Sequence, residues 1–92
     1  MRTTIYKYPL TNNGGDLQKL ELPSGAKILH FGLQDNKLYL WAKVVLGFTK
    51  ELRFFRVVGT GCELGINSGE YIGTIFQGPY VWHLFEVQNP GE

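Results

Sequence analysis

Hydrophobic residues in this chain alternate with other residues, and this period of two constrains the fold more than any other feature. The alternation is clearest over residues 37–46, with apolar positions at Leu38, Leu40, Ala42 and Val44. A β-strand places successive side chains on opposite faces, whereas an amphipathic helix repeats its apolar residues every three or four positions. No stretch of the chain keeps that helical spacing. The sequence therefore predicts an all-β fold.

Turn-forming residues divide the chain into about seven short strands. They are expected over residues 3–9, 17–22, 26–34, 37–46, 51–58, 71–77 and 80–88. Asp35 and Asn36 tolerate the positive φ angles of a two-residue hairpin turn. In the third strand, alternation places Leu29, Phe31 and Leu33 on one face. Short strands at regular spacing predict a small antiparallel β-sandwich or barrel.

Length and charge limit the classes of protein that the chain can belong to. Its 92 residues make one small domain, expected over residues 1–88, with a frayed tail at 89–92. The formal net charge of +1 gives no electrostatic argument for binding duplex DNA or an anionic membrane. No apolar run approaches the roughly 20 residues of a membrane-spanning helix and no signal peptide is evident, so we expect a cytoplasmic protein.

The residues that usually carry catalysis form no recognisable motif. Cys62 is the single cysteine, which excludes a disulfide framework and a cysteine-based zinc site, and we expect it to be a half-buried loop residue. His30 and His83 lie far apart and match no metal-ligand spacing. No nucleophile signature occurs, and the acidic residues are scattered. The sequence predicts a protein that is not an enzyme and needs neither metal nor cofactor.

Phosphate binding has a weak signal around residues 56–61. Gly59-Thr60-Gly61 follows a strand, where glycine N–H groups and the Thr60 hydroxyl could approach an anion. A plain strand-ending turn is the competing interpretation. Arg56 projects from an otherwise apolar strand face and needs a partner, either a ligand phosphate or a carboxylate such as Glu86.

Aromatic residues offer surfaces on which a nucleobase could stack. Tyr39, Trp41 and Lys43 share one strand face, which puts two rings beside a cation. Stacking on one ring is worth roughly 1–3 kcal/mol for any base. Tyr8 lies on a strand that is expected at a sheet edge, and His83 could donate to a phosphate. Packing in the core or at an oligomer interface remains the alternative for each of these side chains.

Five segments, read together, resemble a family of small proteins encoded by bacteriophages and prophages. They are IYKYPL (5–10), LPSGAKILHF (22–31), LYLWAKV (38–44), FRVVGTG (55–61) and YIGTIFQGPYVWHLFE (71–86). The resemblance runs nearly end to end, and such sequences are similar to phage nucleotide sponges that inhibit CBASS-type signalling by cyclic oligonucleotides. It implies a homo-oligomer, such as a tetramer, that holds a cyclic dinucleotide or related signal in the infected bacterial cell without cleaving it.

Within the matching segments, several side chains suit a ligand with two bases and two phosphates. The candidate ligand-binding residues are Tyr8, Trp41, Arg56, Thr60 and His83. A site between subunits is expected, because so small a domain has little room for an internal cavity. The segment 59–69 is a candidate either for setting the choice of ligand or for acting as a lid. Two other functions remain open: direct inhibition of a host defence protein, and a minor structural role in the virion.

Overall fold

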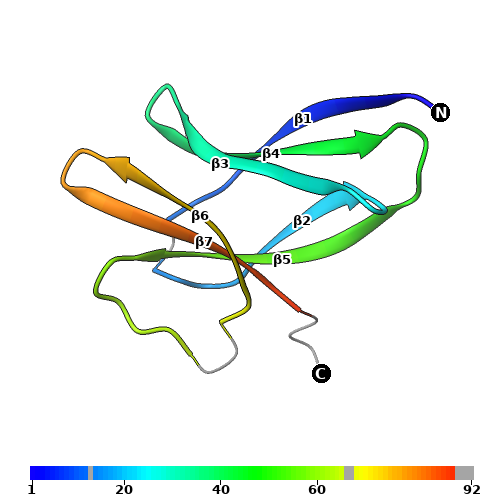
Figure 1. The fold of residues 1–92 in the computed structure, drawn as a ribbon. Helices are drawn as coiled ribbons and strands as arrows, with labels where there is room; N and C mark the ends of the chain where they lie inside the picture. The colour runs from blue at the N-terminus through cyan, green and yellow to red at the C-terminus, as the bar shows by residue number, and fades with distance from the viewer. Residues whose placement is uncertain (13, 66–67, 89–92) are drawn as a thin grey trace.

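The computed structural model describes residues 1–12, 14–65 and 68–88, and these residues form seven antiparallel strands and no helix (Figure 1). The strands are β1 (Thr3–Pro9), β2 (Gln18–Pro23), β3 (Lys27–Gln34), β4 (Lys37–Val45), β5 (Lys50–Gly59), β6 (Glu70–Gln77) and β7 (Tyr80–Val87). The all-β prediction is confirmed, and every predicted strand end lies within one residue of the observed one. The tail at 89–92, expected to fray, lies outside the described residues. Within the described part of the chain, no helix could cross a membrane.

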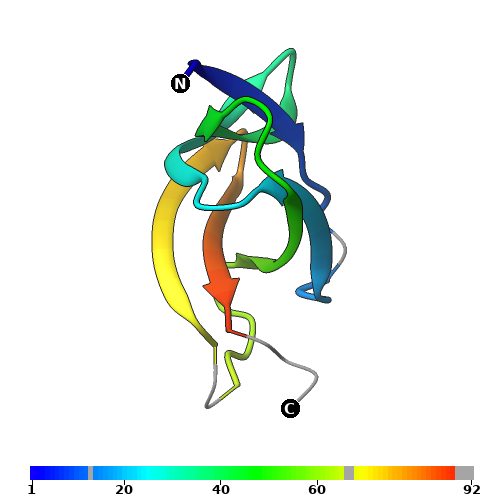
Figure 2. The same ribbon diagram turned by 90° about the vertical axis from the view of Figure 1, so that its right-hand side faces the viewer.

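The strands form two sheets. We call β1-β4-β3 the small sheet and β2-β5-β7-β6 the large sheet, in their order of hydrogen bonding. Figure 2 shows the four strands of the large sheet side by side. The chain passes from one sheet to the other in the β1–β2, β2–β3 and β4–β5 connections. From β5 to β7 it stays in the large sheet. This arrangement is a small β-sandwich, as predicted.

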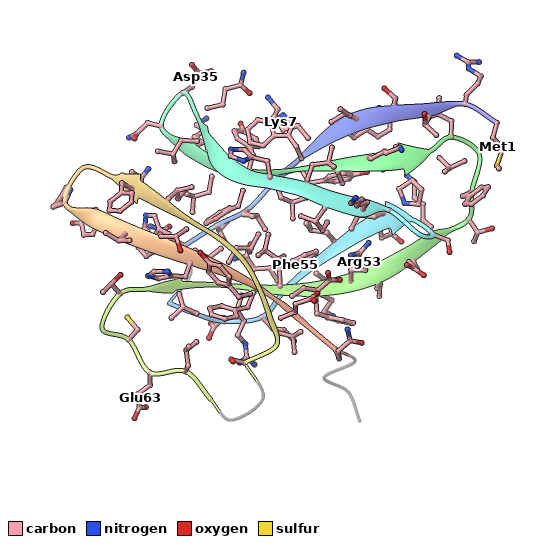
Figure 3. The ribbon with its side chains drawn as sticks, in the orientation of Figure 1. Met1, Lys7, Asp35, Arg53, Phe55 and Glu63 are labelled. Carbon is pink, nitrogen blue, oxygen red and sulfur yellow. The ribbon has the colours of Figure 1, made fainter. Side chains whose placement is uncertain are left out.

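The core lies between the sheets and is built from the inward positions of each strand. Each of its main side chains is at most 6% exposed: Leu22, Phe31, Leu38, Leu40, Ala42, Val44, Phe55, Val57 and Leu84. Figure 3 shows Phe55 between the two sheets, whereas Lys7 lies on the outer side of the small sheet. Removal of this apolar surface from water is the main force that holds the sheets together. The alternation in residues 37–46 therefore identified the buried face of β4 correctly.

A bulge in β3 overturns one sequence prediction. Leu29 was expected to share the face of Phe31 and Leu33, but it is 45% exposed. The pairing with β4 shifts between Ile28 and His30, so Leu29 is the extra residue. A β-bulge places two residues opposite one and shifts the following side chains to the other face. Ile28 and Phe31 are three positions apart, so strict alternation would put them on opposite faces. Because of the bulge, both point inward.

The hairpin between β3 and β4 closes as predicted. Gln34 pairs with Lys37, which leaves Asp35 and Asn36 as the two loop residues. Their φ angles are 51° and 62°. A two-residue type I′ turn requires positive φ at both central positions, and short polar side chains tolerate it.

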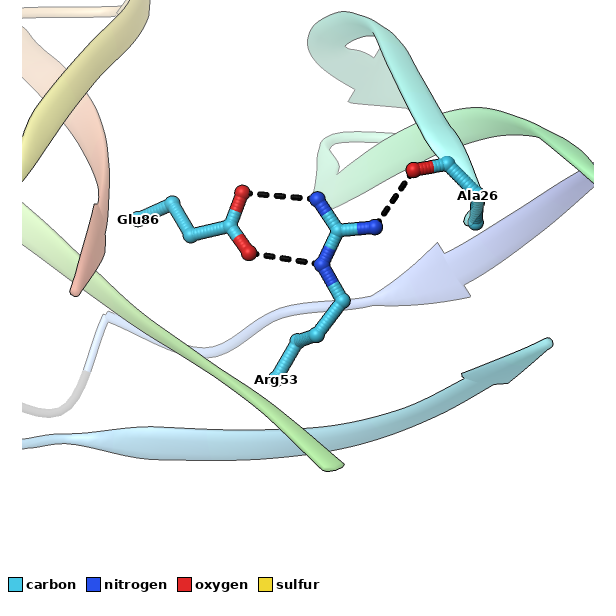
Figure 4. A network of polar contacts seen from close by, with 3 residues as sticks. All are labelled: Ala26, Arg53 and Glu86. Carbon is cyan, nitrogen blue, oxygen red and sulfur yellow. Dashed lines mark hydrogen bonds and ion pairs between the residues drawn. The ribbon is translucent and has the colours of Figure 1, made fainter. Parts of the chain in front are cut away.

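Two polar clusters join the sheets at the edges of the core. In the first, Arg53 donates from Nε and Nη2 to the carboxylate of Glu86 at 2.6 and 2.8 Å, and from Nη1 to the carbonyl of Ala26 (Figure 4). The hydrogen bonds with Glu86 raise the pKa of Arg53 above its usual value, although burial opposes this shift. In the second, Gln77 accepts from Nε1 of Trp82 at 2.8 Å and donates to the carbonyl of Asn36 at 2.8 Å.

The first cluster corrects a sequence interpretation. Glu86 was offered as a structural partner for Arg56, but its partner is Arg53. Strand parity explains this outcome, because Arg53 and Phe55 point inward from β5 and Arg56 points outward. Glu86 lies opposite the buried Phe55 and is therefore on the inner face as well.

Candidate functional site

Tyr8 lies on the inner face of the small sheet. It is opposite Leu40, half-buried, and packed against the core. Burial raises the pKa of Tyr8 above its usual value, and the nearby Tyr6 adds to the shift. β1 is an edge strand, as predicted, but Tyr8 turns away from the face that carries Trp41. In a single chain, Tyr8 and Trp41 cannot contact the same base.

Trp41 lies on the outer face of the small sheet with two ring neighbours. The ring centroid of Trp41 is 5.7 Å from that of His30 and 5.9 Å from that of Tyr39. Tyr39, Trp41 and Lys43 share this face, as the alternation predicted, because Leu38, Leu40 and the other even positions of β4 are buried. This face is described further below.

The other three candidates lie together on the outer face of the large sheet. Arg56 pairs with Phe85 of β7, and Val58 pairs with His83. The backbone N–H of Thr60 donates to the carbonyl of Val81 at 3.0 Å, which continues this pairing to the end of β5. The structure therefore divides the five predicted residues into three locations and brings Arg56, Thr60 and His83 together.

His83 is held between two threonines. The Thr60 hydroxyl is 2.7 Å from Nε2 and the Thr74 hydroxyl is 2.9 Å from Nδ1. Tyr71 extends this hydrogen-bond network, because its hydroxyl is 2.6 Å from that of Thr74. Because a hydroxyl can donate or accept, this arrangement suits either tautomer of the neutral ring.

This network positions polar groups but does not resemble a catalytic triad. The Thr60–His83 contact has the length of a nucleophile–base pair. In a triad, however, a carboxylate orients the imidazole and stabilises its charged form. Here the neutral Thr74 occupies that position. The arrangement occupies both ring nitrogens of His83 and holds the Thr60 hydroxyl in place at the surface.

A cavity of about 270 Å³ is lined in part by Arg56, whereas Thr60 and His83 are not among its lining residues. Its walls include Val58, Gly59, Cys62 and Trp82 together with the glycines of the β1–β2 connection. Gly59 lies opposite Trp82, and a Cβ at Gly59 would come within 3.3 Å of the indole ring. The volume is just below the roughly 300–1,000 Å³ of typical ligand pockets.

Arg56 has an unmet hydrogen-bonding requirement in the wall of this cavity. Its Nε atom is buried and has no hydrogen-bond partner among the described residues. Arg53 shows the contrast, because its guanidinium binds Glu86 and a backbone carbonyl. A buried donor without an acceptor costs about 1–3 kcal/mol, and more when the group is charged.

Sequence reasoning missed some members of this site. Tyr71 and Thr74 are three positions apart, so strict alternation puts them on opposite faces. A bulge between Tyr71 and Gly73 in β6 brings them to the same face. Cys62 is exposed rather than half-buried as expected. Among the residues that the structure describes, no three His, Cys, Asp or Glu side chains lie close enough to hold a metal ion.

Comparison with known proteins gives the family but not the activity. No curated protein matches the chain, and no solved structure matches it. A family described as "Domain of unknown function (DUF7352)" matches residues 1–92. The chain therefore belongs to this family.

Proposed function

We propose that this member of the DUF7352 family is a phage counter-defence protein that binds a nucleotide immune signal, such as a cyclic dinucleotide, and sequesters it without cleavage. It would act as a homo-oligomer in the cytoplasm of the infected bacterial cell. The phage setting rests on the sequence resemblance described above. The proposed binding site lies in the large sheet, with Arg56, Thr60 and His83 on its outer face and Trp82, which packs against the core, in the wall of the cavity.

One observation carries the proposal: Arg56 lines a cavity, and its buried Nε has no hydrogen-bond partner among the described residues. A phosphodiester oxygen is a charged acceptor of the kind that arginine binds most strongly. Thr60 and His83 present a hydroxyl and an imidazole on the same sheet face. These groups fit binding of a phosphate rather than attack on it, because no carboxylate accompanies the imidazole.

Trp82 supplies the aromatic surface of this cavity, a role that the sequence analysis assigned to Trp41 or Tyr8. Its ring is half-buried and oriented by the hydrogen bond from Nε1 to Gln77. Gly59 lies opposite Trp82 and has no side chain that could cover the adjacent part of the indole ring. A nucleobase that enters the cavity would contact this ring, with a stacking energy of roughly 1–3 kcal/mol.

The size of the cavity supports a site shared between copies of the chain. A volume of about 270 Å³ is small for a ligand with two bases and two phosphates. A second copy could complete the site, and the large sheet has apolar side chains that such a copy would cover. Tyr71 is 57% exposed and Phe76 is 73% exposed. Exposed rings of this kind are typical of protein interfaces.

Thermal unfolding with a panel of cyclic dinucleotides tests the proposed activity. A ligand that binds only the folded state raises the unfolding temperature. Its contribution to the free energy of unfolding grows with the logarithm of the ligand concentration over Kd and is about 2.7 kcal/mol at 100 times Kd. After denaturation, the released ligand should be chromatographically intact. Recovery of a linearised product would show an enzyme instead. The absence of a shift with every ligand, together with capture of a host defence enzyme, would favour the direct-inhibitor alternative.

A further inference from the structure

Charge is divided unequally between the two sheets, although the chain is nearly neutral overall. The strands of the small sheet contain four lysines and no Asp or Glu. The lysines are Lys7, Lys27, Lys37 and Lys43, and all four are exposed. The acidic residues within strands all belong to the large sheet. The formal charge of +1 therefore conceals a cationic surface of the small sheet.

The register places these four lysines on the same side of the small sheet. Lys7 pairs with Trp41, and Lys43 pairs directly with Lys27. Like charges directly opposite each other on paired strands destabilise a sheet. No described carboxylate forms an ion pair with either side chain, since the ion pair found joins Arg53 and Glu86 in the large sheet. Repulsion between Lys27 and Lys43 therefore destabilises the small sheet, and an anionic ligand would reduce this repulsion.

Three rings lie among these lysines, with the ring centroid of Trp41 5.7 Å from that of His30 on β3 and 5.9 Å from that of Tyr39 on β4. The His30 ring lies over Gly32, where a Cβ would come within 2.6 Å of His30 Nε2. Lys7 places its ammonium group 4.5 Å from the centre of the Tyr39 ring. The opposite face of the same strands forms the core.

We propose that this outer face of the small sheet binds single-stranded nucleic acid. Exposed rings on an antiparallel sheet stack on unpaired bases, and flanking lysines neutralise the phosphates. Lys37 and Lys43 are six residues apart on β4, which is about 20 Å at the rise of a strand. That length suits a short run of nucleotides over three rings. A duplex would hide its base faces from the rings.

This surface is separate from the proposed cyclic-dinucleotide site, so the two proposals can fail independently. Trp41 and the lysines are on the outer face of the small sheet, whereas Arg56 and His83 are on the outer face of the large sheet. The core lies between them. Arg56→Ala is therefore expected to leave binding of single strands unchanged.

Fluorescence anisotropy with labelled uridine oligomers of about 12 nucleotides, made as RNA and as DNA, tests the proposal at about 50 mM salt. The oligomer that binds more tightly indicates whether the natural ligand is RNA or DNA. Trp41→Leu removes the ring and keeps an apolar side chain, and it should weaken binding about tenfold or more. Trp41→Phe keeps a ring and should stay within about threefold of the parent. Unfolding curves must show that both variants remain folded.

Paired lysine variants test the electrostatic part. Lys27→Gln/Lys43→Gln should reduce the slope of log affinity against log salt by about 1.4, because each phosphate contact in a single strand contributes about 0.7. Lys19→Gln/Lys50→Gln makes the same charge change on the large sheet and should leave the slope unchanged. The proposal is wrong if neither oligomer binds, if a duplex binds equally well, if Trp41→Leu binds like the parent, or if both lysine pairs have the same effect.

Discussion

Arg53 and Glu86 form a two-point ion pair between β5 and β7, with side chains that are 18% and 16% exposed. The guanidinium also binds the carbonyl of Ala26, which begins the path into β3 of the other sheet. One side chain thereby joins the two sheets at an edge of the core. Arg56, three residues along the same strand, has no such partner for its Nε within residues 1–12, 14–65 and 68–88. The two arginines therefore allow a stabilising role to be separated from a binding role.

Arg53→Ala should lower the free energy of unfolding by about 2–3 kcal/mol, because it leaves a mostly buried carboxylate without its charged partner. Lys50→Ala removes an exposed cation from the same strand and should change the free energy of unfolding by less than about 0.5 kcal/mol. Urea unfolding of both variants makes this comparison. Equal effects of the two substitutions would show that the ion pair contributes no net stability.

Tyr8 should make the fold sensitive to alkaline pH. Burial raises the pKa of Tyr8 above its ordinary value of 10.0, so the unfolded chain loses this proton at a lower pH than the folded one. The stability due to the protonated phenol is fully present below the unfolded pKa and is lost as pH rises through the folded pKa. Tyr8→Phe should therefore flatten the fall in unfolding free energy above about pH 10. Tyr80→Phe, at an exposed ring, controls for the loss of a hydroxyl. A profile for Tyr8→Phe that matches the parent would contradict this account.

Gly69 should not tolerate a side chain. Its φ angle is +99°, and a Cβ would lie 2.2 Å from the backbone carbonyl oxygen of Glu86. Gly69→Ala should cost more than about 2 kcal/mol of unfolding free energy, because both the φ angle and the backbone clash oppose it. Gly65 has no atom within 4 Å of the same built position. Gly65→Ala is the matched control, and thermal unfolding of the two variants should differ clearly.

The sequence predicted the fold well because the signals that set it are local. Alternation over residues 37–46 identified the buried face of β4, and the Asp35-Asn36 dipeptide identified its hairpin. The two bulges, at Leu29 and Ile72, escaped prediction because one extra residue reverses the parity without an evident local signal. These bulges decided which side chains of β3 and β6 share a face.

The candidate site was harder to predict, because alternation assigns residues to faces of a strand but does not say which faces meet. Trp41 and His83 both point outward, as their alternation allowed, but from different sheets. The sequence also could not predict which side chains form ion pairs. Glu86 pairs with Arg53 rather than Arg56 because β5 and β7 are neighbours in the large sheet and both Arg53 and Glu86 point inward. The grouping of Arg56, Thr60 and His83 required the pairing of β5 with β7.

Calorimetric titration of Arg56→Ala with the cyclic dinucleotide that most raises the unfolding temperature tests the central claim most directly. Loss of a charge-assisted contact of about 1.5–3 kcal/mol should weaken binding roughly ten- to a hundredfold, while the variant keeps the unfolding temperature and oligomeric state of the parent. Lys50→Ala should bind like the parent. If folded, oligomeric Arg56→Ala binds the ligand as tightly as the parent does, the cavity beside Arg56 is not the nucleotide site.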